Sequence, residues 1–312
     1  MLGAAVSPRS RRAAHASGAY AVVTPARDEE DNLRRLHACL MAQTVAPAQW
    51  IVVDGGSSDC SRSVTRELSL GKAAVELVSL ERSSVDPVRG GPVVQALHNG
   101  FANVRSGTSV VAKVDADVSF GPEYFESLLD ELEQDPRLGI VSGSRYELVN
   151  ERWTEQPVTG SSVNAQCRAY RATCLQEILP FEERSGWDTI DEIEANLLGW
   201  RTRTLRNVCF RHHRPIGARD ESRWKTWYAE GKTCHYLHYR PTYTCVRALY
   251  RARRDIAALG LPLGFVAATV RRQTRHPMAD VRRFVREEQR LRHLATRAAE
   301  ALGRRPLAEY WR

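Results

Sequence analysis

The amino-acid sequence predicts an α/β protein in which helices flank a mostly parallel β-sheet, followed by a helical, basic C-terminal extension. Short apolar runs rich in Val and Ile alternate with segments whose apolar residues recur at helical spacing. Gly, Pro and Asp residues separate the two kinds of segment. Strands that alternate with helices in this way form βαβ units, whose strands run parallel.

The first half of the chain contains four predicted strands with helices between them. Tyr20–Thr24 is an apolar run, and the acidic residues after it suit a helix N-terminus. Leu33, Leu36 and Leu40 mark one face of that helix. Further strands are expected at 50–54, 75–80 and 109–114, and further helices at 59–68, with Asp59 as N-cap, and at 92–104.

Beyond residue 118 the pattern is less regular. An irregular region rich in Trp, Gly and polar residues runs to about residue 165, and from about residue 220 the chain is mostly helical. Helices are expected at 123–134, 166–178 and 189–199, and strands at 139–146 and 201–211.

The charge is unevenly distributed. The net charge is +8, and residues 271–312 contain twelve Arg against five acidic residues. We expect a disordered extension over 1–18, a main domain over 19–217 and a helical, basic region over 218–312. Such a basic region favours an anionic partner, namely nucleic acid, an acidic membrane surface or a phosphorylated substrate, although Arg-rich helices are also often simply solvated.

Cysteine usage and hydropathy indicate a cytoplasmic protein. The seven cysteines are odd in number and include no Cys-x-x-Cys pair, so neither a disulfide framework nor a zinc site is expected. Residues 1–18 lack the apolar segment of a secretory signal. The uncharged stretch 256–270 is shorter than the roughly 20 residues of a membrane span. It suits a membrane interface, which would place the protein peripherally on the inner face of the membrane.

Asp115 and Asp117 directly follow the apolar run that ends at Val114. Alternate side chains of an extended chain share a face, so these carboxylates are expected to project together. Two close carboxylates repel one another unless a cation lies between them, and Mg²⁺ or Mn²⁺ with diphosphate oxygens is a common arrangement. The alternative is a solvated acidic turn before the next helix.

A neighbouring predicted strand also ends in an acidic residue. Asp54 closes the second strand, and the turn Gly55-Gly56 follows it. Ligands of such sheets bind beyond the carboxyl ends of the strands. One crevice is therefore expected to collect Asp54, Asp115 and Asp117.

Five segments occur in a specific order along the chain. They are Val23–Glu30, Ile51–Asp59, Val93–Gly100, Val114–Asp117 and Gly186–Glu192. Together, over residues 20–215, they resemble the family-2 glycosyltransferases of the GT-A fold, a two-lobed Rossmann-like domain. The resemblance implies a nucleotide-binding half over 19–118 and an acceptor half over 119–217. It does not extend over the C-terminal hundred residues.

The resemblance implies residues that bind a UDP-, GDP- or TDP-linked sugar donor. They are Thr24, Pro25, Ala26, Arg27, Asp28, Asp54, Arg89, Lys113, Asp115 and Trp187. The first five would line the nucleotide pocket, and Asp54 would accept hydrogen bonds from the nucleoside. The planar guanidinium of Arg89 suits diphosphate oxygens, unless it is only a loop arginine. Many relatives have a second Asp in place of Gly55 and Tyr-Asn in place of Arg27-Asp28, so the base preference stays open.

Two of these residues have open alternatives. Lys113 shares a strand face with Asp115 and Asp117, so it could pair with a carboxylate or contact phosphate. Trp187, like Trp200, Trp224 and Trp227, could stack on a sugar, but aromatic residues at helical spacing are more often part of a core.

For the metal, the resemblance implies Asp117 as a direct ligand and Asp115 as a ribose or outer partner, although spacing alone does not divide these roles. His212 and His213 end the last predicted strand, where relatives often place a histidine near the metal. Adjacent strand residues point to opposite faces, so at most one should reach the ion, and both could be surface residues. The implied cofactor is Mg²⁺ or Mn²⁺, a Lewis acid for the leaving diphosphate.

Inverting members of this family use a carboxylate base at the start of a helix that precedes a Gly-aromatic pair. Gly199-Trp200 is such a pair, and the position eleven residues before it is Asp188. Asp191, one turn later, is the alternative. Burial and neighbouring carboxylates raise the pKa of such a base toward working pH. Asp188 could instead only cap the helix.

The sequence therefore predicts a metal-dependent inverting glycosyltransferase of the hexosyltransferase type, with a glycan or lipid-linked acceptor in cell-envelope synthesis. A sugar-phosphate nucleotidyltransferase is a second interpretation, but those enzymes usually have a Gly-x-Gly-x-Arg loop where this chain has Thr24–Arg27. A third is a catalytically dead binding protein with this fold. The retention of acidic residues at all the implied sites argues against it, and no nucleic-acid partner is expected.

Overall fold

The computed structural model describes residues 20–71, 75–81, 90–149, 151–214, 222–304 and 307. The chain forms two compact units, Met1–His213 and Arg214–Arg312, which we call the N-terminal and C-terminal units. Each is described by itself. The expected extension over 1–18, the boundary at residue 217 and the predicted donor contact Arg89 lie outside the described residues.

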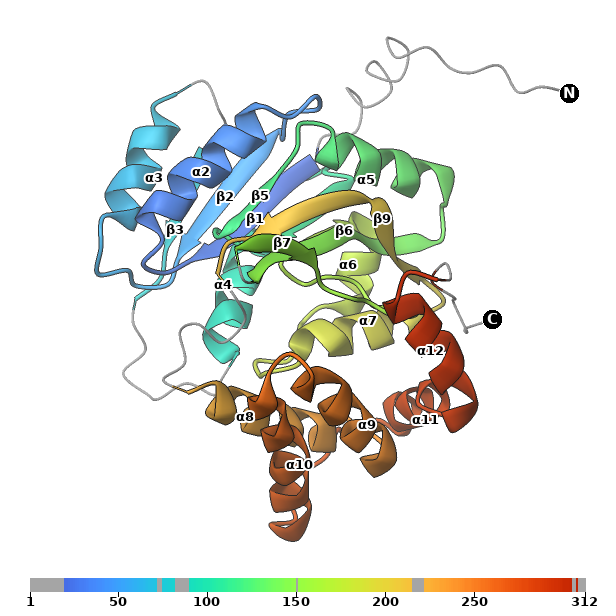
Figure 1. Cartoon of the computed structure of the whole chain (residues 1–312). Coiled ribbons are helices and arrows are strands. Elements are labelled where there is room, and N and C mark those ends of the chain that lie inside the picture. Colours follow the sequence, from blue (N-terminus) through green and yellow to red (C-terminus); the bar gives the residue numbers. More distant parts are fainter. Residues whose placement is uncertain are drawn as a thin grey trace, which may run out of the picture. The chain divides into compact units, whose positions relative to one another are not determined.

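The N-terminal unit is built on one nine-stranded sheet with the order β3-β2-β1-β4-β8-β6-β9-β5, and β7 pairs with β6 at its side (Figure 1). The strands are β1 (Tyr20–Ala26), β2 (Gln49–Asp54), β3 (Val75–Ser79), β4 (Val110–Val114), β5 (Val118–Phe120), β6 (Leu138–Val149), β7 (Arg152–Glu155), β8 (Cys167–Arg171) and β9 (Arg201–His212). β1 to β4 run parallel, as expected for βαβ units, and β8 is antiparallel to both of its neighbours.

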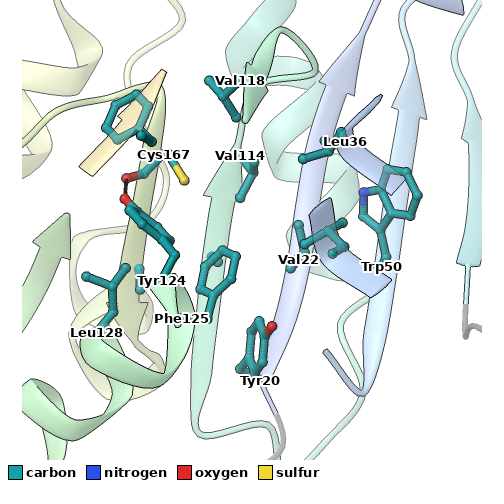
Figure 2. Packing of buried hydrophobic residues seen from close by; sticks show 14 of the residues in the cluster. Tyr20, Val22, Leu36, Trp50, Val114, Val118, Tyr124, Phe125, Leu128 and Cys167 are labelled. Atoms are coloured by element: carbon teal, nitrogen blue, oxygen red, sulfur yellow. Dashed lines mark hydrogen bonds between the residues drawn. The ribbon is translucent and has the colours of Figure 1, made fainter. Parts of the chain in front are cut away.

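Helices cover both faces of this sheet. One face packs against α2 (Glu30–Met41), α3 (Ser61–Ser69) and α5 (Tyr124–Gln134), and the other against α4 (Gly91–Ala102), α6 (Ala172–Ile178) and α7 (Trp187–Leu197). Figure 2 shows the first layer, where Trp50, Leu36, Phe125 and Tyr124 interlock with the strand residues. The Tyr124 hydroxyl donates to the Cys167 carbonyl oxygen at 2.9 Å, so this buried phenol is paired.

Three local predictions about secondary structure differ from the structure. The expected helix over 166–178 is wrong in its first part, because β8 occupies Cys167–Arg171 before α6 begins. A strand buried on both faces lacks the alternation that separates strand from helix, which explains the error. The short strands β5 and β7 lie in segments expected to be a turn and an irregular region.

The C-terminal unit is helical throughout its described part, in line with expectation. Its elements are α8 (Arg223–Tyr236), α9 (Pro241–Ala252), η1 (Ile256–Leu259), α10 (Gly260–Val270), α11 (Ala279–Glu288), η2 (Leu291–His293) and α12 (Leu294–Ala301). α8 and α10 cross backbone to backbone: a Cβ on Gly231 would lie 2.0 Å from the Leu261 carbonyl oxygen, and one on Gly264 would lie 1.9 Å from that of Tyr228. Among the described helices, none has both the length and the apolar character that crossing a membrane requires.

Candidate active site

The Asp115–Asp117 segment connects two strands from different parts of the sheet. β4 lies beside β1, whereas β5 lies at the far end of the strand order and pairs with β9. The Asp115 amide donates to the Gln166 carbonyl oxygen at 2.8 Å, and the Asp117 carbonyl oxygen accepts from the His213 amide at 2.8 Å. The segment is therefore fastened next to both β8 and β9, and its two carboxylates have different surroundings.

Lys113 neutralises the first of these carboxylates. Its ammonium is buried and lies 2.7 Å from Asp115 Oδ1, and it also donates to the Ala165 carbonyl oxygen at 2.7 Å. The Trp187 ring lies against the same ammonium, with its centroid 5.7 Å from Nζ. An acid that already has a buried cation is less suited to holding a metal ion and better suited to accepting hydrogen bonds.

Asp117 instead faces a histidine. His212 Nε2 lies 3.6 Å from Asp117 Oδ1, and the other ring nitrogen, Nδ1, lies 3.2 Å from Glu147 Oε1. Two ligands about 2.1 Å from one Mg²⁺ or Mn²⁺ ion, at angles of 90–120°, lie roughly 3.0–3.6 Å apart. A carboxylate on the second nitrogen of a histidine is the usual support for a metal-binding ring. Asp117 and His212 therefore fit a shared divalent cation.

These two residues would supply only part of a coordination shell. Within the described ranges, no group of three or more His, Cys, Asp and Glu side chains is arranged to hold a metal ion. Mg²⁺ commonly takes one or two protein carboxylates and completes its shell with substrate phosphates and water. Two protein ligands, Asp117 and His212, are therefore compatible with a cation that binds together with a diphosphate.

His213 points elsewhere, as adjacent strand residues must. Its Nε2 lies 2.7 Å from Ser119 Oγ, and its ring packs edge-on against Trp153 at 5.3 Å. Burial lowers the pKa of His213, and neighbouring Arg211 adds to this shift. Of the two histidines proposed from the sequence, His212 is the one that the structure places beside Asp117.

Arg145 lies beside Glu147 on β6. Its Nε lies 3.5 Å from Glu147 Oε1, and its Nη1 donates to Gln166 Oε1 at 3.1 Å. Burial lowers the pKa of Arg145, and the negative charges of Glu147 and Asp188 oppose that shift. A charged chain therefore runs from Asp117 through His212 and Glu147 to Arg145, and the charge of Asp188 lies close enough to act on Arg145.

Asp188 is partly exposed in the first turn of α7. The helix begins after Gly186, whose φ of 89° is a left-handed conformation that glycine adopts without strain. Both terminal nitrogens of Arg168 donate to the Asp188 carbonyl oxygen, at 3.3 and 3.2 Å, and fix the backbone there. The Asp188 carboxylate forms no hydrogen bond with another described residue.

Asp191, the alternative base, has a different environment. Its carboxylate is fully buried and accepts from Arg168 Nη1 at 2.8 Å and from the Tyr170 hydroxyl at 2.6 Å. The same guanidinium lies 3.3 Å from Glu192 Oε1. Burial raises the pKa of Asp191 to about 6, although Arg168 opposes the shift, and burial also raises the pKa of Glu192. Asp191 is therefore a partner in a buried ion pair and is closed to an acceptor.

Trp187 does not form an open stacking surface. Its side chain is only 7% exposed, and its ring stacks on Phe181 with centroids 5.2 Å apart. It lies in the core between the sheet and α4, α6 and α7. A contact between Trp187 and the donor sugar stays a prediction, and the burial of the ring does not favour it. Its contacts with Lys113 and Arg168 make it a support for two buried cations.

The loops after β1 and β2 are joined by acidic side chains. Asp28, with φ of 55°, accepts from the Ser58 amide at 2.7 Å, and the backbone hydrogen bond from Ser58 holds the pKa of Asp28 below its usual range. Asp54 is buried and accepts from the amides of Gly56 and Ser57 at 3.2 Å and from Arg62. Asp54 therefore orders its own loop, and its contact with a nucleoside stays a prediction.

The rest of the implied pocket wall lies at the carboxyl end of β1. Thr24 is fully buried, and its hydroxyl oxygen accepts from Trp50 Nε1 at 3.0 Å. Pro25 is partly buried, Ala26 is buried, and Arg27 is exposed. Only the end of this segment, at Arg27 and Asp28, is exposed to solvent, so it is the part most open to a ligand.

Sequence reasoning missed several residues that organise this site. They are Arg145, Glu147, Gln166 and Arg168. Arg145 and Glu147 alternate on β6, but the strand was expected to end at residue 146, before Glu147, so their shared face was not apparent. Arg168 could not be found in this way, because its segment was expected to be helical. Its burial between two acids depends on contacts across distant parts of the chain.

A Rossmann-like sheet whose strand ends gather an Asp-x-Asp segment, a histidine and a helix-borne carboxylate defines a glycosyltransferase of the GT-A class. The model of the family described as "Glycosyl transferase family 2" matches residues 21–186, more than half of the chain. The chain belongs to glycosyl transferase family 2. No curated protein matches the sequence.

Solved structures with the same fold include enzymes from bacteria and archaea. TarS from S. aureus has a TM-score of 0.52 and 18% identity, over 70% of this chain and 39% of the TarS chain. The mannosyltransferase PcManGT from Pyrobaculum calidifontis, in complex with GDP-Man and Mn²⁺, has a TM-score of 0.54 and 14% identity, over 90% and 84% of the two chains. TarS 1–349 with UDP-GlcNAc has a TM-score of 0.54 and 17% identity, over 80% and 73%. At such identities, the likeness shows the fold alone.

Proposed function

We propose that this glycosyltransferase is metal-dependent and inverting, and that it transfers a sugar from a nucleotide-diphosphate donor to a hydroxyl of a glycan or lipid-linked acceptor. The observation that carries the proposal is the charged chain from Asp117 through His212 and Glu147 to Arg145, with the charge of Asp188 close enough to act on Arg145. It links a pair of groups that fit a cation to a partly exposed carboxylate. Because glycan and lipid-linked acceptors occur in cell-envelope synthesis, the proposal includes a role in that process.

At the donor end, Asp117 and His212 would hold the Mg²⁺ or Mn²⁺ ion. When bound, that ion would offset the charge that develops on the leaving nucleoside diphosphate. Asp115, already neutralised by Lys113, would accept a hydrogen bond from a ribose hydroxyl. The Mn²⁺ and GDP-Man named for the P. calidifontis mannosyltransferase support a divalent cation and a nucleotide-diphosphate sugar as the ligands.

At the acceptor end, Asp188 would be the general base. It would take the proton from the acceptor hydroxyl while that oxygen forms a bond to the anomeric carbon, and the bond from this carbon to the diphosphate oxygen breaks. Attack opposite the leaving group inverts the anomeric configuration. Asp191 is excluded from this role in the proposal, because its carboxylate is occupied by Arg168 and Tyr170.

Part of the C-terminal unit would contact an anionic membrane surface. α10 contains no charged residue, yet Leu263, Val266 and Val270, which lie at helical spacing, are 52%, 55% and 75% exposed. Exposed arginine pairs lie before and after this stretch, at 253–254 and 271–272. An apolar helix face bordered by arginines suits the boundary between lipid chains and headgroups.

Titration of Mn²⁺ during nucleotide binding tests the proposed function. We expect UDP, GDP or TDP to bind with an affinity that rises with Mn²⁺ and falls when Asp117 is changed to Asn. The absence of metal-dependent affinity for all three nucleotides would contradict metal dependence. For the membrane contact, Val266→Asp should reduce sedimentation with phosphatidylserine vesicles, and unchanged sedimentation would argue against it.

A further inference from the structure

Four arginines of the C-terminal unit form a group that the proposed glycosyl transfer does not use. They come from three segments: Arg240 precedes α9, Arg275 lies between α10 and α11, and Arg282 and Arg286 lie one turn apart on α11. We call these four residues the arginine cluster. Residues 222–304 contain eighteen Lys and Arg against six Asp and Glu, a net charge of +12, so the cluster lies in a strongly positive region.

Hydrogen bonds bring the three segments together. Arg240 Nε donates to the Arg286 carbonyl oxygen at 2.9 Å, and the Arg240 amide donates to Gln289 Oε1 at 2.8 Å, which joins the start of α9 to the end of α11. Arg275 Nε donates to His235 Nε2 at 3.1 Å, near the end of α8. The cluster is therefore fixed by the fold of the unit.

The cluster has no carboxylate to balance it. Among the described residues, none of the four arginines forms an ion pair with an acid. Acidic side chains of this unit pair with other arginines: Glu287 with Arg290 and Arg292, and Glu288 with Arg297. The acids that are close in sequence to the cluster therefore pair with arginines outside it.

The four charges also lie close enough to affect one another. Burial lowers the pKa of Arg286, and the charges of Arg282, Arg240 and Arg275 lower it further. His238 shows the same effect, since burial lowers its pKa and Arg275, Arg282 and Arg286 act in the same direction. Like charges at such distances are unfavourable unless an anion offsets them.

One buried donor at the cluster has no partner. Arg286 Nε is buried and forms no hydrogen bond with a described residue. Buried polar atoms in folded proteins are nearly always hydrogen-bonded, so each unpaired atom needs an explanation. A ligand with several acceptor oxygens would supply one.

We propose that the arginine cluster binds a phosphate group, carried by either a soluble phosphorylated compound or a lipid headgroup. Guanidinium groups present paired N–H donors that match phosphate oxygens, and an anion with about two negative charges would reduce the mutual repulsion. The two sources share this chemistry. The proposal does not depend on the glycosyl transfer, because the residues involved are not part of the candidate active site.

The test uses the full chain with a chelator present, so that divalent cations cannot bring phosphate to the Asp117 site. Inorganic phosphate and pyrophosphate are titrated by calorimetry at constant ionic strength. Arg282→Gln should weaken saturable binding at least about tenfold, because it removes one charge-assisted contact. Arg283→Gln is the matched control: it makes the same change on the next residue of α11, equally exposed, and should alter the affinity less than about twofold.

A second measurement identifies the source of the phosphate. Vesicles of phosphatidylcholine with phosphatidic acid are compared with vesicles that carry phosphatidylserine at equal total charge. Saturable binding of a soluble phosphate supports a soluble ligand, whereas binding confined to phosphatidic acid vesicles supports a headgroup. In both cases, only the Arg282 variant should lose the interaction.

Two outcomes would overturn the proposal. One is the absence of saturable binding in both measurements, and the other is an equal loss in the Arg282 and Arg283 variants, which indicates general surface charge. Thermal unfolding of both variants checks that they fold. Arg286→Lys keeps the positive charge but removes the paired N–H donors of the guanidinium group, so it should also weaken phosphate binding. Unchanged affinity in that variant would count against a role for the guanidinium geometry.

Discussion

The buried cations of the N-terminal unit each lie against a carboxylate, whereas the arginine cluster of the C-terminal unit does not. Lys113 meets Asp115 at 2.7 Å, Arg168 meets Asp191 at 2.8 Å, and Arg145 lies 3.5 Å from Glu147. In the arginine cluster, acids that lie nearby in sequence pair with other residues.

The two arrangements of cations suit different roles. A buried cation that is already paired cannot recruit a ligand strongly, but it can fix the backbone and the acids around it. In the N-terminal unit these pairs lie near Asp117 and Asp188, the groups that we propose for the substrate. In the arginine cluster of the C-terminal unit, we propose that the cations themselves bind a ligand. The following experiments test this contrast.

The largest effect is expected at Asp188, whose partly exposed carboxylate forms no hydrogen bond with another described residue. Asp188→Asn should lower the turnover number by about 10²–10⁴-fold, because general base catalysis contributes about that much. Donor binding should be retained. Steady-state kinetics and nucleotide titration measure the two quantities, and turnover close to that of the unchanged enzyme would remove Asp188 from the role of base.

A large loss of stability is expected when a buried pair is broken. Asp191→Asn should lower the free energy of unfolding by about 3 kcal/mol, because it leaves the Arg168 charge with only one acid in the interior. Glu67→Gln is the control. It breaks the exposed pair with Arg34 and should cost much less, because solvent screens that pair. Denaturant unfolding measures both, and equal costs would contradict the structural role of Asp191.

A smaller effect is expected at Glu147, which orients His212. Glu147→Gln should weaken Mn²⁺-dependent nucleotide binding about 10–100-fold, as is usual for the carboxylate behind a metal-binding histidine. His213→Ala is the comparison, because the His213 ring faces Ser119 and Trp153. If His213→Ala weakens metal-dependent binding as much as Glu147→Gln, the assignment of His212 is wrong.

The smallest effect concerns pH. Burial raises the pKa of Asp191 from its usual value to about 6 in the folded protein, so the folded state holds a proton that the unfolded chain releases nearer pH 4. This stabilisation is present at low pH and is lost as pH rises through about 6. Glu192→Gln should make the unfolding free energy depend less on pH, since Arg168 then forms an ion pair with Asp191 alone. A curve of unfolding free energy against pH that is unchanged in the variant would refute the electrostatic coupling between Asp191 and Glu192.

Much of the fold could be predicted, because strand and helix periodicity in residues 20–134 is strong and local. The four parallel strands and the helices between them match expectation closely. β8 could not be predicted, since a strand buried on both sides has no alternation to reveal it. β5 was missed because three residues carry too little pattern.

The candidate site could be proposed from the sequence to the extent that its residues lie in short motifs. Asp115, Asp117 and Asp188 were named from motif order, and His212 and His213 together from their place at a strand end. Their partners could not be named in this way. Glu147 and Arg168 act through contacts that join segments far apart in sequence, and the burial that makes Trp187 a core residue depends on α4 and α6.

The attachment of the Asp115–Asp117 segment has one more consequence. Its first amide is bound beside β8 and its last carbonyl beside β9, with β6 between those strands. The length that residues 115–117 must span is therefore set by the spacing of these strands in the sheet. A change in the spacing between β8 and β9 would therefore alter the separation of the Asp115 and Asp117 carboxylates.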